Sequence, residues 1–141
     1  MKRHGSAVWT GSLKEGKGTV STGSGTHQHV QYSFGTRFEE GTGTNPEELV
    51  AAAHAACFSM ALSAQLTNAG TPPERINTTA SLTFEKTEPG FTVTSIHLQT
   101  AAKVPGANAQ SFEKAAQAAK TGCPISRLLN TEITLDAHLE S

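Results

Sequence analysis

The most apolar stretch of the chain runs from residue 49 to residue 62, where only His54 and Ser59 are clearly polar. A run of this length indicates a helix that is apolar nearly all round rather than a strand. Such a helix is normally buried, because no side of it is polar enough to face water. The run therefore predicts a buried central helix.

The residues that flank this run predict where the helix begins and ends. Asn45 can cap the first turn, Pro46 suits the first helical position, and Glu48 follows the cap by three residues, as in a capping box. Gly70 can close the other end in a left-handed conformation. The helix is expected within residues 44–70.

Three short segments with apolar residues precede this helix and predict strands. They cover residues 6–13, 19–22 and 30–38, and the last alternates through Phe34. Segments rich in Gly, Ser and Thr separate them, so we expect an antiparallel meander.

Alternating segments also follow the helix. Residues 76–86 and 91–104 flank a turn and predict a hairpin, in which the alternation slips between Val93 and Ile96 and indicates a β-bulge. Ser111 is the expected cap of a second helix.

The remaining segments complete the expected order. The second helix covers residues 111–121, a short third helix covers 124–130, and an alternating strand covers 132–139. The order βββ-α-ββ-αα-β predicts one α+β domain over residues 1–141, with antiparallel pairing.

Composition adds a reason to expect an oligomer. Only 36% of the 141 residues are hydrophobic and 6% are aromatic. A chain this polar needs a partner subunit to cover so apolar a helix.

Charge and hydropathy exclude several classes of protein. The net charge of −1 comes with no basic stripe, so no nucleic-acid partner is expected. The basic start of the chain is followed by no apolar segment, so no secretory signal is expected. No run reaches the roughly 18 apolar residues of a membrane span. We expect a cytoplasmic protein with no membrane partner.

Cys57 and Cys123 are the only two cysteines. Two thiolates cannot make a four-thiolate zinc site, and a permanent disulfide is not expected without an export signal. A transient, catalytic disulfide between them remains open. So does the plainer interpretation that Cys57 is a small core residue.

A reactive Cys57 requires a nearby cation, because it lies about three turns into its helix, beyond the help of the helix dipole. Arg37 is the best candidate, flanked by Phe34 and Phe38 in an expected strand. Alternatively, this arginine lies at a strand edge and points into water. Glu47 and Glu48 can pair with Arg37 or simply favour the helix N-terminus.

The distance between Glu47 and Cys57 along the expected helix limits what Arg37 can contact. Glu47 and Cys57 are ten residues apart, which is about 15 Å along a straight helix. A single Arg37 cannot easily touch both on one helix. If it bridges them, the two come from antiparallel helices of two subunits.

Other polar residues leave further alternatives open. Cys123 lies at an expected helix N-terminus, which would favour its thiolate, so the residues alone do not decide which cysteine attacks first. His54 is one turn from Cys57, as in a thiol hydrolase, although a packed or partner-facing histidine is preferred. His27 and His29 are a weak metal motif and are taken as exposed side chains.

Several segments together resemble one known family. They are KGTVST (17–22), FGTRFE (34–39), GTNPEELVAAAHAACFSMAL (43–62), GCP (122–124) and EITLD (132–136). They resemble the OsmC/Ohr family, which comprises osmotically induced protein C and the organic hydroperoxide resistance proteins. The position of Arg37, just before the central helix, resembles that of the arginine in the OsmC branch. In the Ohr branch the arginine lies nearer the N-terminus, where this chain offers only Lys14 and Lys17.

The resemblance implies a fold and a set of site residues. The fold is a single OsmC-like domain, with antiparallel sheets wrapped around two buried central helices in an intertwined homodimer. Cys57 matches the peroxidatic cysteine and Cys123 the resolving one. Arg37 matches the activating arginine and Glu47 the glutamate that holds it, with Glu48 less suited to that role.

The resemblance also implies an activity, a thiol peroxidase that reduces organic hydroperoxides in oxidative and osmotic stress defence. It uses a Cys57 sulfenic acid, a Cys57–Cys123 disulfide and an external dithiol, which in Ohr relatives is a lipoyl-bearing protein. No metal or other cofactor is expected. Plausible lining residues of an apolar site, each of which could equally be core, are Phe34, Phe38, Phe58 and Met60. The rival interpretations are a Cys57–His54 hydrolase or acyl carrier and a non-enzymatic stress or binding protein.

Overall fold

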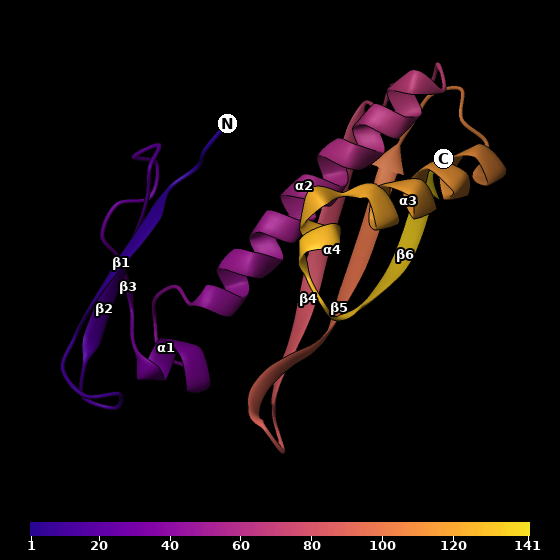
Figure 1. Ribbon diagram of the computed structural model, residues 1–141. Coiled ribbons are helices and arrows are strands. Elements are labelled where there is room, and N and C mark those ends of the chain that lie inside the picture. Colours follow the sequence, from indigo (N-terminus) through magenta and orange to yellow (C-terminus); the bar gives the residue numbers. More distant parts are fainter. The chain divides into compact units, whose positions relative to one another are not determined.

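The computed structural model describes residues 1–141, which form two compact units, Met1–Leu49 and Val50–Ser141 (Figure 1). Ten elements follow the order βββ-αα-ββ-αα-β, with one more helix than expected. Each unit is described by itself below.

The first unit contains the expected meander. Strands β1 (Gly5–Thr10), β2 (Lys17–Thr22) and β3 (Val30–Tyr32) pair antiparallel in the order β1-β2-β3. Gly18 of β2 lies under the rings of Trp9 and Tyr32, where a Cβ atom would collide with both. The antiparallel pairing of β1 with β2 and of β2 with β3 confirms the prediction of three antiparallel strands.

The strand expected over residues 30–38 is wrong in its second half, which forms the short helix α1 (Phe34–Phe38). Ser33 caps it in a capping box: the Thr36 N–H donates to Ser33 Oγ at 3.3 Å, and the Ser33 N–H donates to Thr36 Oγ1 at 2.9 Å. Phe34 and Phe38 also satisfy the four-residue spacing of a helix face, with ring centroids 4.9 Å apart. A spacing of four residues fits both the two-residue period of a strand and the 3.6-residue period of a helix. The capping box at Ser33 favours the helix.

The long helix α2 (Pro46–Asn68) begins and ends as predicted. Asn45 Oδ1 accepts a hydrogen bond from the Glu48 N–H at 2.8 Å. At the other end Gly70 is left-handed, with φ of +84°, and the Thr71 N–H donates to Leu66 O at 2.9 Å.

The expected burial of α2 is only partly present. One line of side chains at four-residue spacing is buried, namely His54, Phe58, Leu62 and Leu66. On other faces Leu49 and Met60 are 38% and 77% exposed.

The expectation that no segment is long and apolar enough to span a membrane is wrong for α2. By length and composition this helix could cross one, with a mean hydropathy of 1.5. Core helices of ordinary proteins pass the same test, and the buried line of α2 belongs to such a core.

The second unit is built on the strands β4 (Arg75–Thr87), β5 (Gly90–Lys103) and β6 (Glu132–Glu140), in the order β4-β5-β6. The β4–β5 hairpin is antiparallel, and Thr94 is the extra residue of a bulge, because Thr83 pairs with Ser95 and Phe84 with Val93. The predicted hairpin and its bulge are confirmed.

Antiparallel pairing does not extend to the last strand, because β6 is parallel to β5. Helices α3 (Ala109–Gly122) and α4 (Pro124–Leu128) connect the two strands. Two parallel neighbours require such a crossover, usually through a helix, and the αα segment provides it. The cap of α3 is Asn108 rather than Ser111, which is instead the third residue of the capping box.

Helices α2 and α3 lie over one face of this sheet (Figure 1), and their apolar side chains form the core with β5. The core side chains are Phe58, Leu62, Leu66, Leu98, Ala102, Val104, Phe112, Ala115, Ala116 and Ala119. This core fixes α2 against the end of α3, where the second cysteine lies.

Candidate active site

The two cysteines meet in the second unit. Cys57 lies on α2 and is half-buried, whereas Cys123 follows α3 and is fully buried. Both thiols are free, and their Sγ atoms are 2.7 Å apart. A disulfide needs about 2.05 Å between sulfurs, so only a small closure separates this pair from the bonded form.

The backbone explains how Cys123 reaches this position. Its N–H donates to Ala119 O at 3.0 Å and ends α3, and the same residue begins α4. Pro124 keeps the preceding residue out of the helical region, and Cys123 is accordingly extended in ψ, at 127°. The chain therefore bends at Cys123, between the end of α3 and the start of α4. Its buried thiol contacts Cys57.

The surroundings of Cys57 favour the neutral thiol. Burial raises the pKa of Cys57, and the contact with the Cys123 thiol raises it further. A hydrogen bond from the backbone of Ile125 opposes these effects and favours the thiolate. Within the unit, Cys57 is therefore a weaker acid than an ordinary cysteine, and a nearby cation would favour its thiolate.

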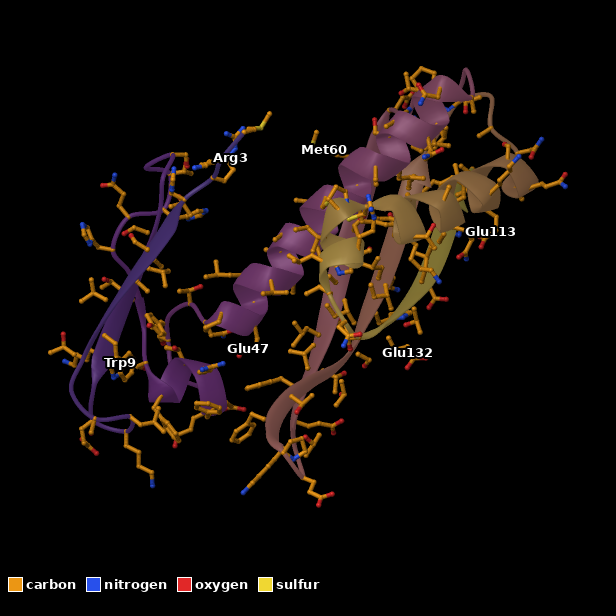
Figure 2. All side chains as sticks on the ribbon, in the orientation of Figure 1. Arg3, Trp9, Glu47, Met60, Glu113 and Glu132 are labelled. Atoms are coloured by element: carbon orange, nitrogen blue, oxygen red, sulfur yellow. The ribbon has the colours of Figure 1, made fainter.

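Arg37 and Glu47 form an ion pair in the first unit. Arg37 Nη2 and Nε lie 2.7 and 2.9 Å from Glu47 Oε1, so one carboxylate oxygen accepts from two donors of the guanidinium. The Glu47 side chain is only 13% exposed and its Oε2 is buried with no hydrogen-bond partner. Glu48, the alternative partner, is exposed and contributes its backbone N–H to the helix cap. The acidic residue that holds Arg37 is therefore Glu47, which Figure 2 labels at the start of α2.

A small apolar cavity adjoins this ion pair. It has a volume of about 230 Å³ and is lined by Trp9, Leu13, Tyr32, Ser33, Phe34, Arg37 and Phe38. The guanidinium carbon of Arg37 lies 5.2 Å from the ring centroid of Phe38, within the range of a cation–π contact. Aromatic side chains and one cation thus line the same cavity.

The four expected lining residues separate into three groups. Phe34 and Phe38 line the cavity of Arg37. Phe58 is fully buried in the core, and Met60 stands out from α2 on its exposed side (Figure 2). Phe58 is therefore a core residue and does not line the cavity.

His54 is fully buried, and Nε2 of its ring lies 2.7 Å from Ser126 Oγ on α4. The other ring nitrogen, Nδ1, is buried without a hydrogen-bond partner, and burial lowers the pKa of His54. The preferred interpretation of a packed histidine is confirmed, because the ring hydrogen-bonds Ser126 and not Cys57. Sequence reasoning missed Ser126, whose only signal is its position three residues after Cys123.

The remaining histidine motif forms no cluster. His27 and His29 are exposed near the start of β3. No group of three or more His, Cys, Asp or Glu side chains is placed to hold a metal ion.

Comparisons with known proteins converge on one group. The family model described as OsmC-like protein matches residues 39–138. The peroxiredoxin OsmC of Escherichia coli K12 is 52% identical over 141 residues, which cover 100% of this chain and 99% of that protein. A protein of the same name from Shigella flexneri matches equally well.

Solved structures show the same fold at lower identity. The organic hydroperoxide resistance protein OhrB of Bacillus subtilis superposes with a TM-score of 0.68 at 20% identity, covering 97% of this chain and 98% of that one. An OsmC-like protein from Mycoplasma pneumoniae gives a TM-score of 0.74 at 14% identity, covering 100% and 99%. The α+β arrangement of sheets and helices is therefore that of these proteins.

Proposed function

This chain belongs to the OsmC family, and from that premise we propose that it is a cysteine-based peroxidase that reduces organic hydroperoxides to alcohols. The observation that carries the proposal is the contact of two free thiols at 2.7 Å, one of them fully buried. Inert core thiols have no need to meet, whereas a peroxidase that recycles through a disulfide requires it. The relative at 52% identity is named a peroxiredoxin, which supports the same activity.

The first step oxidises Cys57. Its thiolate attacks the terminal oxygen of R–O–O–H, the O–O bond breaks, and the leaving alkoxide takes a proton to become the alcohol. Sulfur is oxidised to sulfenic acid, and the hydroperoxide is reduced.

The second step forms the disulfide. Cys123 attacks the sulfenic sulfur, the S–O bond breaks, and the hydroxyl leaves with a proton as water. The covalent bond protects Cys57 from a second oxidation. An external dithiol then reduces the disulfide by exchange, and a lipoyl-bearing protein has the required chemistry.

Arg37 supplies the cation that Cys57 lacks. A guanidinium near the sulfur favours the thiolate and stabilises the charge that develops on the leaving oxygen. Glu47 orients this guanidinium through the two hydrogen bonds to Oε1. Burial raises the pKa of Cys57, so the thiolate requires this help at neutral pH.

A homodimer brings these groups together. Glu47 and Cys57 lie on one continuous helix, ten residues or about 15 Å apart along the axis. A guanidinium held by Glu47 does not reach a sulfur that far along the same helix. We infer that Arg37 and Glu47 of one copy serve Cys57 of a second copy, in a single OsmC-like domain repeated twice.

The cavity beside Arg37 favours substrates with an apolar tail. Its aromatic walls gain roughly 0.8 kcal/mol for each CH₂ group that they remove from water. A cumene or fatty hydroperoxide therefore has a higher kcat/KM than hydrogen peroxide. Equal values for cumene hydroperoxide and hydrogen peroxide would contradict this preference.

The cell compartment follows from the proposed cycle. A disulfide that must be reduced in every turnover suits the cytoplasm, where thiol reductants are abundant. Metal or organic cofactors have no step in this cycle, and neither nucleic acid nor membrane has a role in it.

Intact-mass analysis after one equivalent of hydroperoxide tests the proposal. The reduced protein is expected to lose two hydrogen atoms, mapped to a Cys57–Cys123 bond. Cys123→Ser retains the first turnover and gains oxygen at Cys57, whereas Cys57→Ser consumes no hydroperoxide. An unchanged mass would show inert thiols, and consumption that survives Cys57→Ser would show another route.

Substitution of Arg37 tests the assigned cation. Arg37→Ala is expected to lower kcat/KM for cumene hydroperoxide by about 10²-fold, the usual cost of one electrostatic contact to the reacting atoms. Arg3→Ala is the matched control, because Arg3 is exposed and bonds only its neighbour Lys2. If Arg37→Ala reacts as fast as Arg3→Ala, the role given to Arg37 is wrong.

A further inference from the structure

The segment after α3 contacts α2 at a second point besides the thiols. Ser126 Oγ lies 2.7 Å from His54 Nε2. His54 precedes Cys57 by three residues on α2, and Ser126 follows Cys123 by three residues on α4. The sulfur contact and the hydrogen bond therefore lie about one helical turn apart on both helices.

Both partners of this hydrogen bond are buried. His54 is 0% exposed and Ser126 is 8% exposed. Because His54 Nδ1 has no partner, the polar bonding of the buried ring rests on Ser126. Separating the pair would leave both groups buried without a partner, which costs more than the bond itself contributes.

Besides Ser126, helix α4 is held to α2 by the hydrogen bond from the backbone of Ile125 to Cys57. Helix α4 has five residues, too few to be stable by itself. Leu128, at its end, is 74% exposed, so apolar burial contributes little there. The contacts of α4 with α2 therefore help to hold the chain that follows Cys123 in place.

We propose that the His54–Ser126 hydrogen bond is a latch that holds Cys123 against Cys57 and so promotes disulfide formation. His54 and Ser126 are positioning residues, since they act through the placement of Cys123. The catalytic role of the latch rests on the proposed peroxidase function, but its effect on the closing of the thiol pair does not.

The latch has a consequence during turnover. Cys123 and a second hydroperoxide molecule compete for the Cys57 sulfenic acid, which becomes a disulfide with one and a sulfinic acid with the other. When the latch holds Cys123 against Cys57, more of the sulfenic acid becomes disulfide. Opening the latch therefore increases sulfinic acid without slowing the attack on the first hydroperoxide.

Ser126→Ala tests the latch without any peroxide. In equilibrium with dithiothreitol, the constant for Cys57–Cys123 disulfide formation is expected to fall roughly tenfold, because the reduced chain holds its thiols together less of the time. For a two-electron couple this factor is about 30 mV. Ser126→Thr keeps the hydroxyl and is expected to restore the constant.

A matched control removes a different hydrogen bond of α2. Ser59 Oγ donates to Thr78 Oγ1 at 2.8 Å and ties the same helix to β4. Ser59→Ala should leave the disulfide constant unchanged. An unchanged constant in Ser126→Ala, or an equal fall in Ser59→Ala, would overturn the latch.

Substitutions of His54 provide a second route if Ser126→Ala does not fold. The amide of Gln extends to the place of Nε2, whereas that of Asn ends at the place of Nδ1. His54→Gln should therefore keep the constant closer to that of the parent chain than His54→Asn does. Equal constants for the two variants would contradict the latch.

Peroxide experiments separate this inference from the proposed function. The sulfinic fraction of Ser126→Ala at excess cumene hydroperoxide should exceed that of the parent chain, with the first step unchanged in a Cys123→Ser background. An unchanged sulfinic fraction would overturn the catalytic role of the latch. A parent chain that consumes no hydroperoxide would remove the peroxidase, while the dithiothreitol equilibrium would still decide the latch.

Discussion

At the scale of single residues, burial acts on two ionisable groups of α2 in opposite directions. It raises the pKa of the acid Cys57 and lowers the pKa of the base His54. Each shift favours a neutral side chain, because removal from water disfavours either sign of charge. The site therefore differs from a thiol hydrolase, in which the cysteine and histidine form a thiolate–imidazolium pair, and Arg37 is the cation that we propose for Cys57.

The lowered pKa of His54 predicts a loss of stability in acid. Because the folded-state pKa lies below the ordinary 6.5, this contribution is complete above pH 6.5 and is lost as pH falls through the folded-state value. In that window the free energy of unfolding should fall by about 1.4 kcal/mol per pH unit from this group. Urea unfolding at several pH values measures it.

His54→Gln is the control for this titration. Gln is neutral at all of these pH values, so the acid-dependent difference between the parent chain and the variant isolates His54. Parallel stability curves for the two proteins between pH 7 and pH 5 would show that His54 does not titrate with folding.

At the scale of elements, one side chain joins the two helices that frame the Arg37–Glu47 pair. Asn45 Oδ1 caps α2, and its Nδ2 donates to Thr36 O of α1 at 3.0 Å. The loop between the helices is compact: Gly43 has φ of +143°, and a Cβ atom there would lie 2.9 Å from Gln31 O. The glycines near Arg37 thus permit close contact of the backbone around α1.

Asn45 substitutions separate these two bonds. Asn45→Ala should lower the free energy of unfolding by about 1–2 kcal/mol, the usual cost of a lost cap. Asn45→Asp keeps the capping oxygen and replaces the donor to Thr36 O by a carboxylate oxygen that cannot donate, so it should lose less stability than Asn45→Ala because the cap remains. Both variants should lower kcat/KM, because α1 carries Arg37.

Urea unfolding and steady-state kinetics measure the two effects. The cap assignment requires Asn45→Asp to be clearly more stable than Asn45→Ala. Full activity in Asn45→Asp would show that the bond to Thr36 O does not position Arg37.

At the scale of the whole molecule, α2 has an apolar face that the second unit, Val50–Ser141, leaves uncovered. Met60 is 77% exposed, and the small residues Ala52, Ala53, Ala56 and Ala64 are exposed beside it. So apolar a face on a helix of 23 residues is expected to pack against another protein surface. The proposed second copy of the chain covers this face and also supplies Arg37 to Cys57.

Ala56→Glu tests this assembly. A carboxylate buried between two α2 helices lacks a partner and costs several kcal/mol, so the variant should be monomeric by size-exclusion chromatography with light scattering. Peroxidase activity should fall at least tenfold, because Cys57 loses the Arg37 of the second copy.

Gln110→Glu adds the same charge at an exposed position of α3 and should leave the assembly intact. A fully active monomer of Ala56→Glu would show that each chain completes its own site.

The sequence by itself determined the elements that local chemistry specifies. The ends of α2 follow from Asn45, Pro46 and Gly70, and the β4–β5 bulge follows from a slip in a two-residue period. The Arg37–Glu47 pair and the Cys57–Cys123 pair were also named, the first from charges near a helix start and both from the resemblance to a family. These features depend on residues close in sequence or on long matching motifs.

Only the tertiary structure decided the rest, because it depends on residues far apart in the chain. The parallel pairing of β6 follows from where α3 and α4 return the chain to the sheet. The hydrogen bond between His54 and Ser126 joins positions 72 residues apart, and no local pattern marks the serine as its partner. The uncovered face of α2 could likewise not be seen in a run that is apolar all round, since which side is buried depends on what packs against it.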